Sequence, residues 1–266
     1  SGYEDAVNAS GSTYVAWCWK AGGAAVTNTV GNISAQVSAN DEAGFSIITY
    51  TGDGNSSGNV GTGLRSTQPL DWAIVKRRDS TSDWHVGHSA SGQGVNFAYH
   101  LNLNSTDQLS GSSPYHMGTQ NATLTDRLYL AAGGLTSGAN YVAYVWQERP
   151  GYSKMGVYRA NNSSNGAFFH CGFRPAFIMI KNMDNSSAHW YILDNKRNPE
   201  NECRISLKAN QTGSEVTDNN FIDFLSNGFK LRTDGGFVNN SYNRIFYMAF
   251  AEQTGRTEYN LIANAR

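Results

Sequence analysis

The 266-residue chain has little charge and no excess of either sign. Charged residues make up 15% of it, with 20 basic against 21 acidic side chains, where a quarter is usual. A basic stripe is therefore missing, and with it the electrostatic grounds for binding nucleic acid or an anionic membrane. Gly, Asn, Ser and Thr are abundant instead. Such an uncharged polar surface suits neutral, hydroxylated ligands.

Cysteines and long apolar runs are also scarce. Cys18, Cys171 and Cys203 are odd in number and form no CxxC motif, so neither a disulfide framework nor a zinc site is indicated, and we expect no cofactor. Cys18 is expected to be a small buried hydrophobe. No apolar run approaches the ~20 residues that cross a bilayer, so no membrane insertion is expected. Because the chain begins with Ser1 and not Met, we expect a processed product or part of a longer protein.

One phrase occurs three times, at residues 14–19 (YVAWCW), 141–146 (YVAYVW) and 247–252 (YMAFAE). Its β-branched and aromatic residues predict a buried strand. Other blocks recur in the same order about 106 residues apart: 44–55 with 151–162, 72–79 with 177–184, and 84–88 with 190–194. Four blocks in one order predict a tandem duplication.

Within each repeat, short apolar runs alternate with Gly-, Asn- and Asp-rich turns. This spacing is typical of sandwiches. We therefore predict an all-β fold of two tandem β-sandwich units, jelly-roll or lectin-like, at 44–149 and 150–254, followed by a tail at 255–266. Residues 1–43 are predicted to hold an orphan strand at 14–19 and then a linker. That strand should be covered by the first unit or a neighbouring chain, because an unpaired apolar strand invites aggregation.

Several of these motifs resemble a known family. They are GFSIITYTGDG at 44–54, the Trp/Phe-x-x-x-Lys-x-x-Asp blocks at 72–79 and 177–184, DNKRNP at 194–199, FLSNGFKL at 224–231 and ANAR at 263–266. Together they resemble a domain at the C-terminal ends of tail-fibre and similar virion proteins of marine bacteriophages, including those of cyanobacteria. The resemblance implies an extracellular virion appendage that meets the host surface, often as a homotrimer and beside other virion proteins. It brings no catalytic residue.

The carboxylates give no firm sign of catalysis. A glycosidase needs two carboxylates facing each other across a sugar cleft, and the sequence does not pair any two of its Asp residues in this way. Asp79 and Asp184 share one repeat position, after a strand and before a Ser-rich turn, which favours a turn-forming role. No Gly-x-Ser-x-Gly elbow is present. We expect no enzyme; the alternatives are a polysaccharide-cleaving tail enzyme and a purely structural virion decoration or assembly module.

Recognition of a host-surface glycan or receptor is the remaining expectation. Aromatic faces and polar side chains should come from loops that differ between the units. The candidates in the first unit are Trp84, His85, His88, Tyr99, His100, Tyr115 and His116. Those in the second are Asp194, Lys196, Arg197, Asn198 and Glu200, whose loop could equally be solvated or contact a subunit. His85 and His88 are three apart on a predicted strand, so they should face opposite ways and not share a metal.

Overall fold

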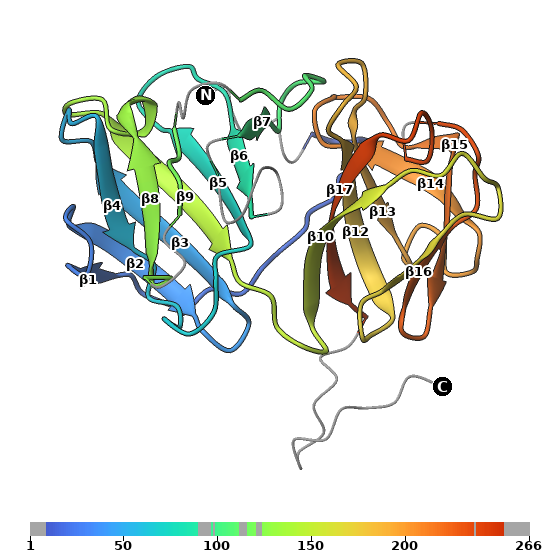
Figure 1. The fold of residues 1–266 in the computed structure, drawn as a ribbon, viewed down its shortest axis with the longest axis horizontal. Helices are drawn as coiled ribbons and strands as arrows, with labels where there is room; N and C mark the ends of the chain where they lie inside the picture. Colours follow the sequence, from blue (N-terminus) through green and yellow to red (C-terminus); the bar gives the residue numbers. More distant parts are fainter. Residues whose placement is uncertain are drawn as a thin grey trace, which may run out of the picture.

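The computed structural model describes residues 9–89, 97, 99–111, 116–120, 124–236 and 238–252. In this part of the chain strands dominate, and the single helix is one short 3-10 turn. None of the described residues form a helix long and apolar enough to span a membrane. Two β bodies lie side by side (Figure 1), so the all-β sandwich prediction is confirmed.

The first body is a seven-stranded antiparallel sheet covered by a two-stranded layer. The sheet order is β1 (Val26–Asn28), β2 (Ala35–Asn40), β3 (Phe45–Thr51), β9 (Asn140–Trp146), β5 (Trp72–Arg77), β6 (His85–His88) and β7 (His100–Asn102). The covering layer pairs β4 (Ser57–Gly61) with β8 (Arg127–Ala131), which leads into the 3-10 turn Ala132–Gly134. Ile48, Val75 and Leu128 lie in the core between the layers.

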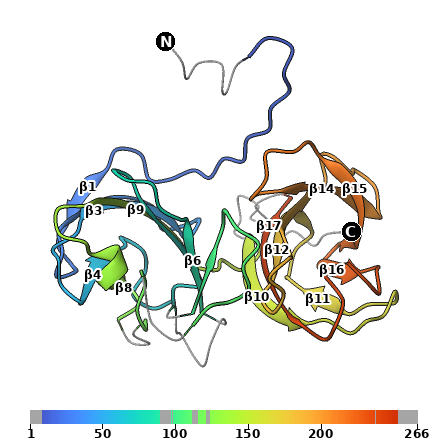
Figure 2. The same cartoon turned by 90° about the horizontal axis from the view of Figure 1, so that it is seen from above.

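The second body is an eight-stranded sheet that curls around its own core (Figure 2). Its order is β10 (Ser153–Arg159), β17 (Arg244–Ala251), β12 (Pro175–Asn182), β13 (Trp190–Asp194), β14 (Cys203–Lys208), β15 (Val216–Leu225), β16 (Gly228–Leu231) and β11 (Phe168–His170). Ile180, Leu193 and Phe229 are fully buried inside it.

The same backbone hydrogen bonds recur in both bodies. Gly52 N donates to Ala139 O at 2.8 Å, and Ala160 N donates to Asn243 O at 2.9 Å. Ala139 and Asn243 are 104 residues apart, whereas the sequence aligns their strands, β9 and β17, at 106. The two-residue difference leaves every side chain on its expected face, because strand side chains alternate with period two. Local sequence similarity therefore gave the right faces for β9 and β17 with a shifted register. Its alignment of 44–55 with 151–162 is one residue away from the structural match of Gly52 with Ala160, which exchanges the faces of β3 and β10.

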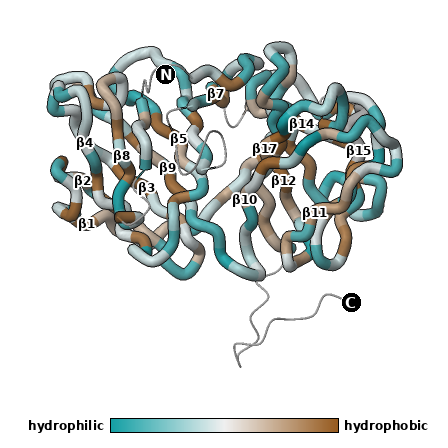
Figure 3. The backbone as a smooth tube through the Cα atoms, viewed as in Figure 1, coloured by the Kyte–Doolittle hydropathy of each residue, from teal (hydrophilic) through white to brown (hydrophobic). Residues whose placement is uncertain are grey.

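A third core lies where the outer faces of the two sheets meet. The ring centroid of Trp72 is 4.3 Å from that of Phe246 and 6.0 Å from that of Trp190. Met179 and Met248 are buried in the same cluster. Hydrophobic stretches run along β9, β12 and β17 (Figure 3). The two bodies are thus joined by apolar packing and not only by the chain.

Residues 9–25 form no strand, so the predicted orphan strand is wrong. This segment, here called the strap, crosses between the bodies (Figure 2). The Trp19 ring packs edge-on against Trp146, Phe177 and Phe250, so its aromatic residues gain apolar contact without strand pairing. Cys18 is exposed, which corrects the expectation of burial, because its neighbours Trp17 and Trp19 pack against the core between the bodies.

The predicted linker contains two strands of the first sheet. Val37 of β2 lies between Val26 of β1 and Ile48 of β3, and it is buried in the first core. Alternation of inward Ala35 and Val37 with outward Gln36 explains the strand and corrects the linker prediction. The second body has no counterpart of these strands, since its β10 is a sheet edge. The tail at 255–266 lies outside the described residues.

Candidate functional site

Three of the candidate histidines gather in the first body. The rings of His85 and His116 stack 3.5 Å apart at 18°, and the His100 ring lies 5.6 Å from that of His85. Burial, and to a smaller extent the neighbouring imidazoles, lower the pKa of His85 to about 4 and that of His116 to about 3. His85 and His116 are therefore neutral near pH 7. No group of metal-ligating side chains among the described residues is arranged to hold a metal ion.

His88 faces the other way, as its spacing from His85 predicts. Its ring packs edge-on against Phe246 at 4.2 Å and lies 5.9 Å from Trp72, in the core between the bodies. Burial lowers its pKa to about 3. His85, His88 and His116 are buried, so the structure corrects their assignment to a ligand-binding surface and gives them packing roles.

Trp84 remains at the surface, with 36% of its area exposed. Its ring lies 6.5 Å from Tyr144 at an interplanar angle of 20°, and Lys76 Nζ is 6.0 Å from the Trp84 ring centroid. Trp190 stands in the equivalent place of the second body, where it is fully buried and donates from Nε1 to Asn102 O at 2.9 Å. One repeat position is thus open in the first body and closed in the second.

The charged loop after β13 is organised by its own contacts. Asp194 Oδ1 accepts hydrogen bonds from the backbone N of Lys196 and Arg197, both at 3.0 Å. Arg197 also pairs with the Asp194 carboxylate and, through Nε, with Glu215 at 3.1 Å. Its guanidinium lies 5.7 Å from the Trp17 ring centroid, within cation–π range. The loop therefore holds the strap.

Asn198 completes this internal framework. Its Oδ1 accepts from the backbone N of Arg204 at 3.1 Å and of Ile205 at 2.7 Å. Lys196 and Glu200 are exposed. The density of charge that makes the loop conspicuous in the sequence has a structural explanation for Asp194, Arg197 and Asn198.

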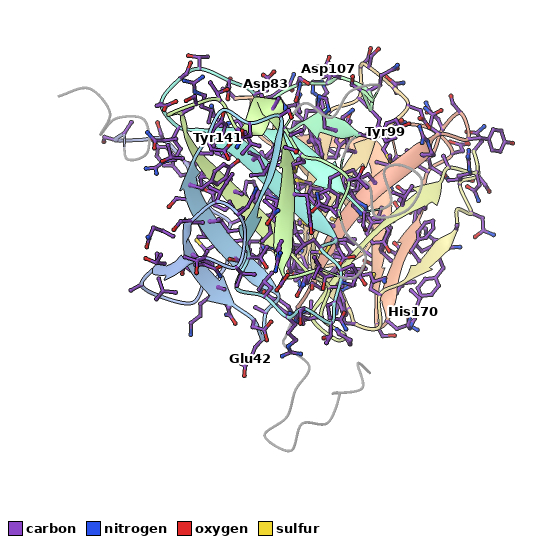
Figure 4. The ribbon with its side chains drawn as sticks, turned by 60° about the vertical axis from the view of Figure 1, so that its left-hand side comes forward. Glu42, Asp83, Tyr99, Asp107, Tyr141 and His170 are labelled. Atoms are coloured by element: carbon purple, nitrogen blue, oxygen red, sulfur yellow. The ribbon has the colours of Figure 1, made fainter. Side chains whose placement is uncertain are left out.

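Tyr99 points to a different place, the junction of the two bodies. Figure 4 shows Asp83, Tyr99 and Asp107 along one edge of the molecule. The pKa of Arg244 is raised, first by its hydrogen bond to Asp184 and, to a smaller extent, by nearby Tyr99. Arg244 Nη2 lies 2.6 Å from Asp184 Oδ1. A residue of the first body thus lies near an ion pair of the second. Tyr115 lies outside the described residues.

Tyr242, two residues before Arg244 in the chain, is a residue that the sequence analysis missed. It is 64% exposed, and both it and Ser241 have positive φ, 55° and 59°. Its equivalent in the first body is Gly138, at φ 71°, since Ala139 and Asn243 make matching hydrogen bonds. Glycine adopts this conformation at no steric cost, whereas tyrosine does not. No sequence motif marks the position; only the strand registers align it with Gly138.

Asp71 has the most clearly perturbed carboxyl pKa among the described residues, raised to about 6 by burial. Such a shift can mark a general acid. Here Asp71 Oδ2 accepts from Glu148 N at 2.7 Å, while Glu148 accepts from Met155 N at 2.8 Å and pairs with Lys154 at 2.7 Å. Both carboxylates thus bind the segment that links the two bodies, which gives them a structural role.

A family model described as a domain of unknown function (DUF7483) matches residues 1–254. The chain belongs to this family. The match covers the strap and both bodies together, so the family is defined by the pair and not by a single repeat. No curated protein matches the chain. No solved structure matches it either.

In this DUF7483 chain, we give the name junction site to the ion pair of Asp184 and Arg244, to Tyr99 near it, and to Tyr242, which precedes Arg244 by two residues. It offers an exposed aromatic ring from Tyr242 and a guanidinium with a carboxylate that together donate and accept hydrogen bonds. The ion pair is part exposed, with side-chain exposures of 38% for Arg244 and 29% for Asp184. The site can bind a polar ligand with an apolar face.

Proposed function

We propose that the chain is a non-catalytic recognition module of a virion appendage, and that it binds a neutral host-surface glycan at the junction site. One observation carries the proposal. Tyr242 has a left-handed backbone conformation at a position where the first body has Gly138. For tyrosine this conformation costs roughly 1 kcal/mol. Because the side chain is mostly exposed, burial does not offset that cost, and contact with a ligand is the reason we assign to it.

The chemistry of the site fits a sugar. A tyrosine ring can lie against the apolar side of a pyranose, while Arg244 and Asp184 bond its hydroxyl groups. The position between two bodies is a common place for ligand sites. The near-neutral charge of the chain favours an uncharged ligand. The virion setting is supported by the resemblance to tail-fibre end domains alone.

The test compares the wild-type chain with Tyr242→Gly on arrays of neutral bacterial oligosaccharides. We expect Tyr242→Gly to raise the free energy of unfolding by roughly 1 kcal/mol, since strain is relieved, and to lose glycan binding. Phe168→Ala is the matched control, because Phe168 is an exposed aromatic residue on β11; it should bind as the wild type does.

Two results would count against the proposal. Undiminished binding by Tyr242→Gly would remove the junction site as the place of recognition. Release of shorter oligosaccharides by the wild-type chain would favour the polysaccharide-cleaving alternative.

A further inference from the structure

The two bodies meet through a corner of the first and a face of the second. The corner consists of Trp72 and the loop 102–109, and the face consists of Lys181, Trp190 and Phe246. Asn102 O accepts from Trp190 Nε1 at 2.9 Å, and Thr106 O accepts from Lys181 Nζ at 3.1 Å. These two polar contacts therefore use backbone carbonyls. A loop with different side chains could present the same carbonyls equally well.

Each part of this interface has a counterpart in the other body. Phe177 lies opposite Phe250 as Trp72 lies opposite Trp146. Trp84 N donates to Asn104 Oδ1 as Trp190 N donates to Asn210 Oδ1. The counterpart face on the first body is thus Lys76, Trp84 and Val142, and the counterpart corner on the second is Phe177 with the loop 208–215.

The counterpart face is open to solvent at Trp84, while Val142 is buried. Trp84 is 36% exposed, whereas Trp190 is fully buried. Lys76 donates only within its own body in the bonds described, to Ser82 O at 2.9 Å and to Ser82 Oγ at 3.3 Å. The first body thus exposes the Trp84 ring, beside Lys76, at the position where Trp190 of the second body contacts the first.

The counterpart corner is covered by the strap. The rings of Trp17 and Trp19 lie 6.2 and 5.7 Å from the Phe177 ring, both edge-on. Trp72, by comparison, is contacted by Trp190 and Phe246 of the second body. The two strap tryptophans therefore cover Phe177 in the way that the second body covers Trp72.

One pair of positions differs in a complementary way. Leu109 N donates to Met183 O at 2.7 Å, and both side chains belong to the apolar core between the bodies. Their counterparts are Glu215 and Arg78. Glu215 matches Leu109 because the residues that follow them pair alike: Val216 pairs with Ser206 as Ser110 pairs with His100. Arg78 matches Met183 because Arg78 N donates to Asn140 O as Met183 N donates to Arg244 O. An apolar contact inside the chain would become an ion pair between chains.

We propose that the face around Trp84 is a docking surface for the Phe177 corner of a second copy, and that the strap covers this corner within its own chain. The copies then associate head to tail, in the relation that the two bodies already have. Such a contact uses two different surfaces, so it continues into a ring or a filament. Association requires that Trp17 and Trp19 leave Phe177.

The test is sedimentation velocity of the full chain over a concentration series. We expect the double variant Trp17→Ser, Trp19→Ser to associate at concentrations where the wild type does not. Adding Trp84→Arg should return the double variant to the monomer. Adding Phe168→Arg in its place is the matched control, because Phe168 is similarly exposed but lies on β11 of the second body; association should persist.

A charge exchange tests the ion pair in the same double variant. Arg78→Glu should weaken association several-fold, and Arg78→Glu with Glu215→Arg should restore it. Circular dichroism establishes that each variant is folded. A folded double variant that stays monomeric would overturn the proposal, as would association that Trp84→Arg leaves unchanged. Binding of an oligosaccharide to the wild-type monomer that Trp84→Arg abolishes would assign the face to carbohydrate and would also overturn it.

Discussion

Tyr50 and Tyr158 donate the same hydrogen bond in the two bodies. Tyr50 Oη donates to Gly134 O at 3.0 Å, and Tyr158 Oη donates to Val238 O at 2.9 Å. Both tyrosines are buried, and burial raises both of their pKa values well above the ordinary range. Each bond ties the strand after the opening turn of its unit, β3 or β10, to the segment that precedes the closing strand.

Replacing either tyrosine by phenylalanine should cost about 1–2 kcal/mol of unfolding free energy, because a buried carbonyl loses its partner. Tyr50→Phe and Tyr158→Phe should have similar effects in urea unfolding, since the bonds are equivalent. We expect one shared transition in both variants, because the core between the bodies couples them. A second, separate transition in only one variant would contradict this coupling.

Acid should destabilise the protein well above the pH at which carboxylates titrate. His85, His88 and His116 have pKa values of about 4, 3 and 3 in the folded chain, against ~6.5 when unfolded. The unfolded state therefore binds more protons between pH 4 and 6.5, and stability falls as the pH is lowered through this window. Three such groups give a slope of at most about 4 kcal/mol per pH unit.

Urea unfolding between pH 7 and pH 5 measures that slope. His88→Leu should reduce it by about one proton, since burial lowers the pKa of His88 to about 3. An unchanged slope would show that His88 is protonated in the folded chain.

Asp71 should contribute in the opposite direction. Its folded pKa is about 6, raised from ~3.9, so the folded state holds a proton that the unfolded state has released. Stability from this group is present below pH 4 and falls as the pH rises to 6. Asp71→Asn should raise the unfolding free energy by roughly 2–3 kcal/mol at pH 8 and by less at pH 5. The amide oxygen can still accept from Glu148 N. An equal gain at both pH values would contradict the assignment.

Most of the fold could be predicted from the pattern of strands in the sequence. Inward and outward positions were predictable because side chains alternate, and the register shift between β9 and β17 did not disturb this. The one-residue shift between β3 and β10 did, because it pairs Tyr50 with Tyr158 and not with Val157. Strands β1 and β2 were not predictable in the same way. β1 has three residues, and the surrounding stretch is rich in Gly, Ala and Asn, so β1 depends on its pairing with β2, which in turn pairs with β3.

The candidate site depended on relations that local sequence does not contain. Trp84 and Trp190 begin matching blocks, yet one is exposed and the other is buried, because only the second is covered by the loop 102–109. The backbone strain at Tyr242 stands out only by comparison with Gly138, and hydrogen bonds across the sheets are what align the two residues. The strap repeats the sequence of a strand but forms none, and its tryptophans pack against the core between the two bodies.

Lys181 gives the last prediction. Its buried ammonium donates to Thr106 O, Asn182 O and Asn185 O at 3.1, 2.8 and 3.5 Å, and burial lowers its pKa to about 8. The unfolded lysine titrates near 10.4, so the unfolded state binds more protons between these values, and stability from this group rises with pH from 8 to 10.

Lys181→Met should therefore lose stability relative to the wild type as the pH is raised, by about 1 kcal/mol per pH unit between 8 and 10. Taking the difference between the two proteins in urea unfolding cancels the titration of tyrosines and cysteines. Lys76→Met is the matched control, because Lys76 is the counterpart residue and is only half-buried. If the two lysines behaved alike, the ammonium of Lys181 would be hydrated, and the interface between the bodies would be looser than its packing indicates.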